Sequence, residues 1–349
     1  MDNQIITAIA SFGMSGQVFH GPFLKVNSGF RVTQILERSK NLSSKLLPNA
    51  EIVRSFDQIL ANPKIELVII NTPDIFHFEM AKQALKAGKN VVIEKPITQK
   101  CADAVELIRL AKQNNVLLTV YQNRRWDGDF LTVKKVLAES KLGRLVEFES
   151  NFDRYRHFIK PNTWKEQGGD EYSGVLYNLG SHMVDQIYLL FGKPKAVTAH
   201  LKIVRNAGVI TDYYNIRFEY EGFSALTKCS YLVKNAGPRY IIHGEFGTFN
   251  KFGLDPQEDE LKAGNLPVGE NWGTEPQEEW GTIFYEKNGV DYEELVETIP
   301  GNYGIFYENV YDVIRKGSEL FVKPEDTVEV LKLLEACKKS NREKRTVVL

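Results

Sequence analysis

Short apolar runs separated by segments with helical spacing make up the first third of the chain. Each run is nearly continuous in apolar residues rather than alternating, which is typical of parallel strands that are buried on both faces. The predicted strands span residues 5–10, 30–36, 65–72, 90–94 and 116–121. Strands that alternate with helices in this way predict a doubly wound parallel sheet of the Rossmann type.

The segments between these runs carry signals for where helices begin and end. The sequence SFDQ at 55–58 is a capping-box pattern, in which the first and last side chains bond to the backbone of the opening helical turn. The segment EMAKQALKAG at 79–88 has helical spacing, and Gly88 is well placed to end it. These boundaries support the alternation of strands and helices.

The pattern changes after Tyr121, because strands then follow one another without helices between them. The predicted strands span 145–152, 196–204, 213–220, 224–233 and 239–244. Strict alternation in YNIRFEY predicts one polar and one buried face, as in an antiparallel sheet. The polar, glycine-bearing residues 253–280 indicate a long loop, and residues 327–340 a closing helix.

These two patterns predict two domains, and a chain of 349 residues is long enough to form them. We expect a dinucleotide-binding Rossmann domain over residues 1–122. An α+β domain with a large, mostly antiparallel open sheet is expected over residues 123–349.

Composition and charge narrow the class of protein. The chain has 44 lysine and arginine residues against 45 aspartate and glutamate residues, so its formal net charge is −1. That balance gives no basic footprint for nucleic acid or an anionic membrane. No apolar stretch reaches the ~18 residues that span a membrane, and the first ten residues lack the parts of a signal peptide. With three isolated cysteines, we expect a cytoplasmic protein that binds neither nucleic acid nor membranes.

The stretch SFGMSG follows the first predicted strand and opens the first predicted helix. Aligned with the G-x-G-x-x-G fingerprint, Gly13 and Gly16 occupy the second and third glycine positions, and Ser11 stands at the first. The fingerprint requires a tight turn, close backbone approach to a pyrophosphate and a helix start directed at it. The residues predicted to bind the dinucleotide here are Ser11, Phe12, Gly13, Met14, Ser15 and Gly16.

Charged residues after the second predicted strand bear on the choice between NAD and NADP. Glu37 lies 21 residues beyond Gly16, where a carboxylate would bind the adenosine ribose hydroxyls; a solvated surface glutamate is the alternative. Arg38 and Lys40 could instead bind a 2′-phosphate. Glu37 disfavours that phosphate, because two like charges about 4 Å apart repel by about 4 kcal/mol at an effective dielectric of ~20. This reasoning favours NAD slightly and leaves NADP open.

Polar residues also follow two further predicted strands, at the carboxyl edge where open α/β sheets bind ligands. The candidate cofactor contacts at this edge are Asn71, Thr72, Pro73, His77, Glu94 and Lys95. His77 is expected to be a helix-start residue that faces solvent or the cofactor edge rather than a catalyst. For Lys95, placement in a site is favoured over a plain surface turn or an ion pair with Glu94 alone.

Together these motifs resemble those of the Gfo/Idh/MocA oxidoreductases, in which EKP is the hallmark. The resemblance covers nearly the whole chain and includes the glycine loop, NTPDIFH, AGKNVVIEKP, QNRRWDGDF, YNLGSHMVDQ and GPRYIIHG. The later motifs are most similar to the branch of NADP-dependent scyllo-inositol dehydrogenases. That likeness favours NADP, whereas Glu37 favours NAD.

The resemblance implies catalytic roles for three residues. Lys95 would reach the substrate hydroxyl beside the nicotinamide, with a cis bond to Pro96, and its pKa would be lowered by the cationic ring and partial desolvation. His182 matches the family pattern Asp-x-x-x-His, whereas Asn178 stands in place of the aspartate. An amide can bond to an imidazole but cannot take a proton or stabilise an imidazolium by charge. Asp185, one turn on, could supply that charge or only stiffen the helix.

Further residues complete the candidate site. The resemblance places Asn123 at the nicotinamide end and Trp164 in a cofactor-side loop. Tyr155, Tyr177 and Tyr240 could line a polyol pocket, since sugars stack on aromatic rings. They could equally be aromatic residues of the sheet. The candidate substrate-binding residues are Lys95, Tyr155, Tyr177, Asn178 and His182. No residues have metal-ligand spacing, and we expect no metal.

The sequence therefore predicts an NAD(P)-dependent dehydrogenase that acts on a CH–OH group of a cyclic polyol or sugar of the inositol type. Lys95, helped by His182, would remove the hydroxyl proton while hydride moves to the nicotinamide. Two alternatives stay open: a non-catalytic NAD(P)-binding regulatory protein and a redox-assisted glycosidase. The resemblance also implies a homo-oligomer, a dimer or tetramer, formed through the open face of the second-domain sheet.

Overall fold

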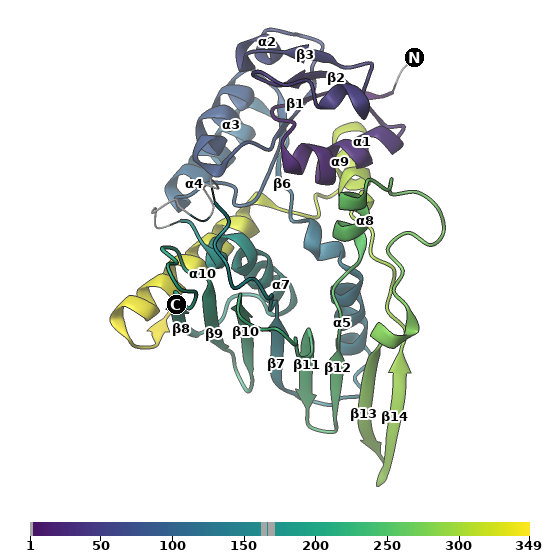
Figure 1. The fold of residues 1–349 in the computed structure, drawn as a ribbon, viewed down its shortest axis with the longest axis vertical. Coiled ribbons are helices and arrows are strands. Elements are labelled where there is room, and N and C mark those ends of the chain that lie inside the picture. Colours follow the sequence, from purple (N-terminus) through teal and green to yellow (C-terminus); the bar gives the residue numbers. More distant parts are fainter. Residues whose placement is uncertain (1–2, 162–165, 167–171) are drawn as a thin grey trace. The chain divides into compact units, whose positions relative to one another are not determined.

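The computed structural model describes residues 3–161, 166 and 172–349, which form two compact units (Figure 1). Unit 1 consists of residues 1–126, 256–273 and 302–328, and unit 2 consists of residues 127–255, 274–301 and 329–349. Both units are therefore assembled from separate stretches of the chain. Two stretches within the predicted second domain, 256–273 and 302–328, pack in unit 1.

Unit 1 is built on a six-stranded parallel sheet with the order β3-β2-β1-β4-β5-β6. The strands are β1 (Ile5–Ile9), β2 (Phe30–Leu36), β3 (Glu51–Val53), β4 (Leu67–Ile70), β5 (Asn90–Ile93) and β6 (Leu118–Val120). The order reverses between β1 and β4, which is the switch point where doubly wound sheets bind nucleotides. The predicted Rossmann-type sheet is confirmed, and β3 is the strand that the sequence did not predict.

The apolar runs form strands here because both faces of the sheet are covered. All four residues of β4 and all three of β6 are buried, which explains why these runs have no polar alternation. The longer helices of unit 1 are α1 (Gly21–Val26), α2 (Phe56–Leu60), α3 (His77–Lys86), α4 (Cys101–Asn114), α8 (Gln257–Ala263) and α9 (Gly304–Lys316). Short helical turns are η1 (Gly16–His20), η2 (Ser43–Lys45), η3 (Asp74–Phe76) and η4 (Asn123–Trp126).

The predicted helix boundaries of unit 1 are confirmed. Ser55 and Gln58 form the capping box that opens α2, with both side-chain-to-backbone bonds present. Gly88 follows α3 with a φ of 71°, in the left-handed region that favours glycine.

The late segment 302–328 is held in unit 1 by polar contacts to residues that directly precede β1 and β4. The Arg315 guanidinium of α9 donates to both carboxylate oxygens of Glu66, at 2.8 and 2.9 Å, and to the carbonyls of Asn3 and Gln4. A two-pronged arginine–carboxylate pair of this kind fixes orientation as well as charge. Helix α9 is therefore an integral part of the Rossmann unit. The sequence did not predict it.

Unit 2 is built on a nine-stranded sheet with the order β14-β13-β12-β11-β7-β10-β9-β8-β15 (Figure 1). The strands are β7 (Leu145–Asn151), β8 (Ala196–Lys202), β9 (Tyr213–Glu219), β10 (Ser224–Ser230), β11 (Tyr240–Gly244), β12 (Gly247–Lys251), β13 (Gly281–Lys287), β14 (Val290–Val296) and β15 (Val347–Val348). Neighbouring strands are antiparallel except β7 and β10, which pair in parallel. The predicted, mostly antiparallel sheet is confirmed, with β12–β14 and β15 as unpredicted additions.

Helices and turns complete unit 2. They are α5 (Gly128–Ala138), η5 (Leu176–Gly180), α7 (Ser181–Phe191) and η6 (Gln277–Glu279), with α10 (Pro324–Glu343) running on from unit 1. The predicted closing helix is confirmed as α10. The predicted long loop over 253–280 is wrong in part, because acidic and apolar residues at helical spacing form α8 within it. Among the described residues, no helix is long and apolar enough to cross a membrane.

Candidate functional site

The glycine loop lies between β1 and η1, at the switch point of the sheet in unit 1. A Cβ on Gly16 would lie 2.6 Å from the Ser11 carbonyl oxygen, so no other residue fits there without moving the backbone. The Asn71 amide, at the end of β4, donates to the same Ser11 oxygen at 2.8 Å and to Ser15 Oγ at 3.2 Å. The loop is thus held tightly at the edge where a dinucleotide would bind.

The residues around this loop fit a bound dinucleotide. A Cβ on Gly13 would meet nothing closer than 3.8 Å, so the backbone there is open to close approach. Asn71 is only 7% exposed, and its Oδ1 accepts no hydrogen bond within the described part of the chain, which leaves an acceptor at the sheet edge. Phe12 is 3% exposed, so any contact of Phe12 with a cofactor is through its backbone.

Glu37 faces its own loop. It is 6% exposed, and its carboxylate accepts bonds from the Leu42 and Ser43 backbone N–H groups and from the Ser43 hydroxyl, at 2.6 to 2.9 Å. Burial raises the pKa of Glu37, but these bonds and the charge of Arg54 outweigh it and hold the pKa below 4.5. Because three donors already occupy the carboxylate, Glu37 is a loop anchor, whereas Arg38 remains exposed.

The turn that carries Lys95 follows β5 directly. The peptide bond between Lys95 and Pro96 is cis, as the family resemblance implied. On one side of the turn, His77 Nδ1 lies 2.8 Å from the Pro96 carbonyl oxygen, and His77 Nε2 lies 3.0 Å from the Thr72 carbonyl oxygen. Carbonyls only accept, so both bonds form together when both ring nitrogens carry hydrogen. The expectation that His77 faces solvent is wrong, because its side chain is 1% exposed and ties the turn to the end of β4.

On the other side, Glu94 holds the start of the same turn. Its Oε2 accepts from the Lys95 backbone N–H at 3.2 Å, and its Oε1 lies 3.1 Å from Nε2 of His20. Burial raises the pKa of Glu94, but the bond from His20 and the charges of His20, Lys95 and His77 hold it below its ordinary value. Glu94 is therefore a carboxylate that orients the lysine backbone from within unit 1.

Unit 2 carries the second candidate segment on η5 and α7. His182 is 5% exposed and Asp185 is 1% exposed, so both face the interior of this unit. The Asn178 side chain is hydrogen-bonded to the phenol of Tyr231, a residue that the sequence gave no reason to select. Burial raises the pKa of Tyr231 although the Arg154 and Arg156 charges oppose it, so this phenol remains protonated. Asn178 thus contacts a neutral hydroxyl.

Two guanidinium groups cover the Tyr231 ring. Those of Arg156 and Arg205 lie 4.6 and 4.8 Å from its centroid, and both arginines pair with Glu166. Arg205 also donates to Asp212 at 2.8 Å, within a side-chain environment that is almost fully buried. The phenol beside Asn178 is consequently held by a buried charge network.

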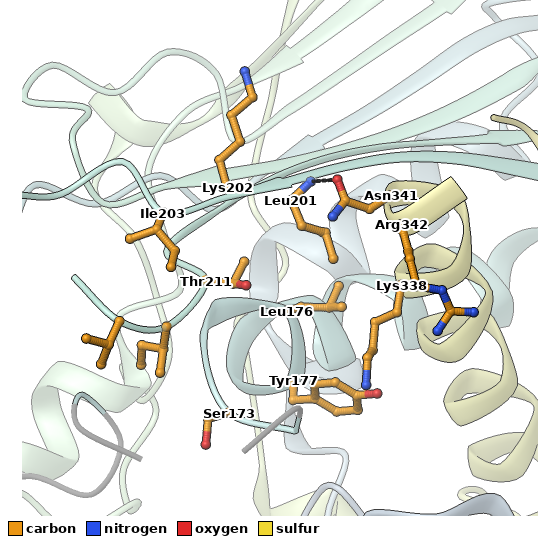
Figure 2. Close-up of a pocket in the computed structure, with 12 residues that line it drawn as sticks. Ser173, Leu176, Tyr177, Leu201, Lys202, Ile203, Thr211, Lys338, Asn341 and Arg342 are labelled. Carbon is orange, nitrogen blue, oxygen red and sulfur yellow. Dashed lines mark hydrogen bonds between the residues drawn. The ribbon is translucent and has the colours of Figure 1, made fainter. Parts of the chain in front are cut away.

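The remaining predicted residues lie in different environments. Tyr177 is buried and lines a cavity of about 480 Å³ beside α10, where the Lys338 ammonium lies 5.7 Å from its ring centroid (Figure 2). Tyr155 is 49% exposed at an isolated bridge to Leu232. Tyr240 is a sheet aromatic, fully buried, whose phenol donates to Gln186 of α7 at 2.9 Å. No group of three or more His, Cys, Asp or Glu residues suited to a metal occurs in the described ranges.

Four further residues were predicted on the cofactor side: Asn123, Thr72, Pro73 and Trp164. Asn123 opens η4 and is 6% exposed. Thr72 and Pro73 lie between β4 and η3 at the same edge as Asn71, with Pro73 exposed. Trp164 lies outside the described residues.

Sequence reasoning missed three residues of these arrangements: His20, Tyr231 and Tyr307, whose phenol lies 2.6 Å from His20 Nδ1. His20 stands in the helix that opens at the glycine loop, and that position was its only signal. Tyr231 lies within the predicted strand 224–233, directly after β10, and Tyr307 lies in a helix that was not predicted. Their partners are distant in sequence, so spacing alone could not identify them.

Comparison with known proteins places both halves of the chain in one family. Residues 6–122 match the model described as "Oxidoreductase family, NAD-binding Rossmann fold", and residues 134–349 match its "C-terminal alpha/beta domain". The NADP(+)-dependent scyllo-inositol 2-dehydrogenase of Bacillus subtilis is 37% identical over 345 residues, which cover 99% of this chain and 96% of that protein.

Solved structures agree with these matches. A crystal structure from Bacteroides fragilis is 46% identical with a TM-score of 0.91, covering 99% of this chain and 100% of its own. An oxidoreductase from Bacillus cereus is 32% identical with a TM-score of 0.91, covering 99% of both chains. The likeness extends over both units.

Proposed function

The chain belongs to the Gfo/Idh/MocA oxidoreductase family, and on that premise we propose that it transfers hydride between NADP and a ring carbon of a cyclic polyol or sugar of the inositol type. The family makes it an NAD(P)-dependent dehydrogenase that acts on CH–OH groups. The substrate class, the preference for NADP and the residue roles are the proposed parts.

One observation supports the proposal above all others. The glycine loop, Asn71 and the Lys95 turn follow β1, β4 and β5, which are neighbours in a parallel sheet, so all three lie at its carboxyl edge. Ligands of open α/β sheets bind at this edge. A lysine whose backbone is fixed there by Glu94 is suited to act on a hydroxyl next to a bound nicotinamide.

The proposed roles follow from the chemistry of each side chain. When bound, the cofactor supplies a nicotinamide ring that accepts or returns hydride. Ser11, Gly13 and Gly16 would hold its pyrophosphate with their backbone. Lys95, helped by His182, takes the hydroxyl proton during oxidation and returns it during reduction.

Asn178 and the candidate pocket residues have separate roles. Asn178 would orient the substrate or the imidazole of His182 as a neutral hydrogen-bonding group. Tyr155 and Tyr177 remain proposed substrate contacts, and Asn123 and His77 proposed contacts on the cofactor side.

Several observations favour NADP over NAD. The Glu37 carboxylate already accepts three hydrogen bonds within its own loop, which leaves it less able to bind ribose hydroxyls. Arg38 and Lys40 beside it are exposed. The NADP(+) specificity of the B. subtilis relative agrees with this assignment. The slight preference for NAD drawn from Glu37 is therefore not retained.

The test is turnover on a panel of inositols and common sugars, with NAD and NADP in parallel, followed by the absorbance of the reduced nicotinamide. We expect turnover with an inositol-type polyol and a lower KM for NADP. In Arg38→Ala, KM for NADP should rise while KM for NAD stays unchanged. Equal KM values for both cofactors in the wild type would contradict the NADP assignment, and turnover only on acyclic alcohols would contradict the substrate class.

A homo-oligomer is also proposed. Unit 2 exposes large apolar side chains on its last hairpin, among them Phe284, Tyr292 and Leu295, each at least 40% exposed. Exposed apolar surface of this kind is typical of subunit interfaces. Light scattering at micromolar concentration should give the mass of a dimer or tetramer, and a monomer would contradict the proposal.

A further inference from the structure

A chain of three side chains in unit 1 ends at the backbone of Lys95. The Tyr307 hydroxyl lies 2.6 Å from His20 Nδ1, His20 Nε2 lies 3.1 Å from Glu94 Oε1, and Glu94 Oε2 accepts from the Lys95 N–H at 3.2 Å. His20 and Tyr307 are both fully buried. The four residues come from η1, α9 and the turn after β5, so the chain connects three separate parts of the unit.

The chemistry of the partners sets the hydrogen positions. A carboxylate only accepts, so His20 Nε2 carries a hydrogen and donates it to Glu94. Burial raises the pKa of Tyr307 well above its ordinary value, and the charge of Glu94 raises it further, so the phenol keeps its proton and can donate it to Nδ1. A single ring hydrogen therefore satisfies both contacts.

The surroundings leave the imidazole of His20 little room to turn. The Tyr121 ring lies 4.5 Å from it between centroids, and the Tyr121 phenol donates to the Phe19 carbonyl at 2.9 Å. Phe306 packs edge-on against Tyr121 at 4.9 Å. A ring held by aromatic neighbours and by two hydrogen bonds has one orientation, and it transmits that orientation to Glu94.

Because η1 opens at Gly16 of the glycine loop and ends at His20, the same short helix links the dinucleotide loop to the carboxylate beside the lysine. We propose that His20, fixed by Tyr307, is a positioning residue that holds Glu94 and through it the backbone of Lys95. This inference rests on the proposed role of Lys95 as the group that moves the hydroxyl proton. His20 itself moves no proton in this assignment; it supplies one donor and one acceptor at fixed places.

Two substitutions of His20 separate this role from acid–base chemistry. A glutamine offers an N–H donor and a carbonyl acceptor at similar reach, whereas a leucine of similar size offers neither. We expect His20→Leu to lower kcat with NADP and scyllo-inositol by about 10- to 100-fold, the loss typical of a misplaced reacting group, with the Kd for NADP unchanged. His20→Gln should retain most of the wild-type kcat. Equal losses in both variants, or wild-type kcat in His20→Leu, would overturn the proposal.

Tyr307 provides a milder change with a matched control on the same helix. Tyr307→Phe removes the hydroxyl that bonds to His20, and Tyr311→Phe, one turn later, removes a hydroxyl that bonds to Asn3 at 2.7 Å. Only the first should lower kcat, while both proteins should keep a wild-type near-UV spectrum. A similar effect of the two variants on kcat would mean that the chain has a purely structural role.

A readout that needs no substrate keeps this inference distinct from the proposed function. Acylation of Lys95 in the protein without added cofactor, followed across pH by mass spectrometry, reports how readily its amine loses a proton. In His20→Leu, the released Glu94 carboxylate is free to approach the ammonium, so acylation should shift to higher pH, whereas in Tyr311→Phe it should not. An unshifted His20→Leu profile overturns the positioning role. A shifted profile in a protein whose Lys95→Ala variant turns over normally contradicts the proposed function alone.

Discussion

The turn at Lys95 and the helix that carries Asn178 and His182 hold their side chains by different means. The turn is bonded on both flanks by buried histidines, His20 through Glu94 and His77 through the Pro96 carbonyl. The helix is held by packing on its sheet, and Asn178 bonds to the phenol of Tyr231 under two arginines.

The two regions also differ in how closely they follow the family pattern. The turn keeps the glutamate, lysine and proline of the hallmark, whereas the helix replaces the expected aspartate by Asn178. In unit 1 the charge that orients the lysine is a carboxylate with a lowered pKa. In unit 2 the residue at the aspartate position is the neutral Asn178, and the arginines around Tyr231 are paired with Glu166 and Asp212. We infer that the proton chemistry depends more heavily on Lys95 than on the helix.

The largest effect should come from removing the lysine. Lys95→Ala should lower kcat by about 10²- to 10⁴-fold, the contribution typical of a positioned acid–base group. Lys86→Ala, on the exposed side of α3, removes the same charge elsewhere in unit 1 and serves as the control. Near-normal turnover in Lys95→Ala would break the comparison, because the well-anchored turn would then have no catalytic role.

The next effect concerns the network that supports Tyr231. Arg205 pairs with Glu166 and Asp212 and has no exposed side-chain surface, so Arg205→Ala leaves two carboxylates buried without it. The free energy of unfolding should fall by about 3 to 5 kcal/mol, as measured with urea. Arg217→Ala removes a pair with Glu219 that is nearly half exposed and should change stability by less than about 1 kcal/mol. Equal losses would show that burial does not distinguish the two pairs.

Asn178→Asp restores the aspartate of the family pattern and tests the same difference between the lysine turn and the helix of unit 2. Asn178→Asp places a carboxylate where it can stabilise a charged His182, and a charge-assisted hydrogen bond worth about 1 kcal/mol more corresponds to roughly a 5-fold rise in kcat on the same substrate. Tyr231→Phe, which removes the phenol beside Asn178, is the companion variant. A fall in kcat would instead identify Asn178 as the residue fitted to this substrate.

The remaining effect concerns Glu37 and depends on pH. Because its pKa is lowered on folding, Glu37 stabilises the protein above its ordinary pKa of 4.5, and that stability is lost as pH falls through the folded value. Glu37→Gln should therefore cost about 1 to 2 kcal/mol of unfolding free energy at neutral pH, with the difference from wild type shrinking below about pH 4.5. Glu51→Gln, at an exposed strand residue, is the control. A difference that does not depend on pH would show that the carboxylate charge is unimportant.

Much of the fold could be predicted because its signals are local. Continuous apolar runs indicated five of the six parallel strands, and alternation indicated β9 in the second sheet. Strand β3 has three residues, as β6 does, but only Val53 of them is buried, so no continuous apolar run marks it. Helix α9 was missed because it begins at a glycine after a stretch of loop.

The site was predictable only in part, because its side chains depend on partners far along the chain. The Lys95 turn and the glycine loop carry motifs that the sequence displays directly. Glu37 was taken for a ribose ligand because its position fits one, and only the structure shows its bonds to Leu42 and Ser43. The bond between His20 and Tyr307 joins residues 287 positions apart, which no spacing rule covers.

The division of unit 1 into separate stretches has a consequence for how the protein is made. On a ribosome, the Rossmann strands emerge first, and residues 1–126 are complete long before residues 302–328 are synthesised. Until α9 emerges, Tyr307 cannot reach His20 and Arg315 cannot reach Glu66. The nascent first unit therefore gains the contacts from Tyr307 and Arg315 only after residues 302–328 have been synthesised. A truncated chain would lack them permanently.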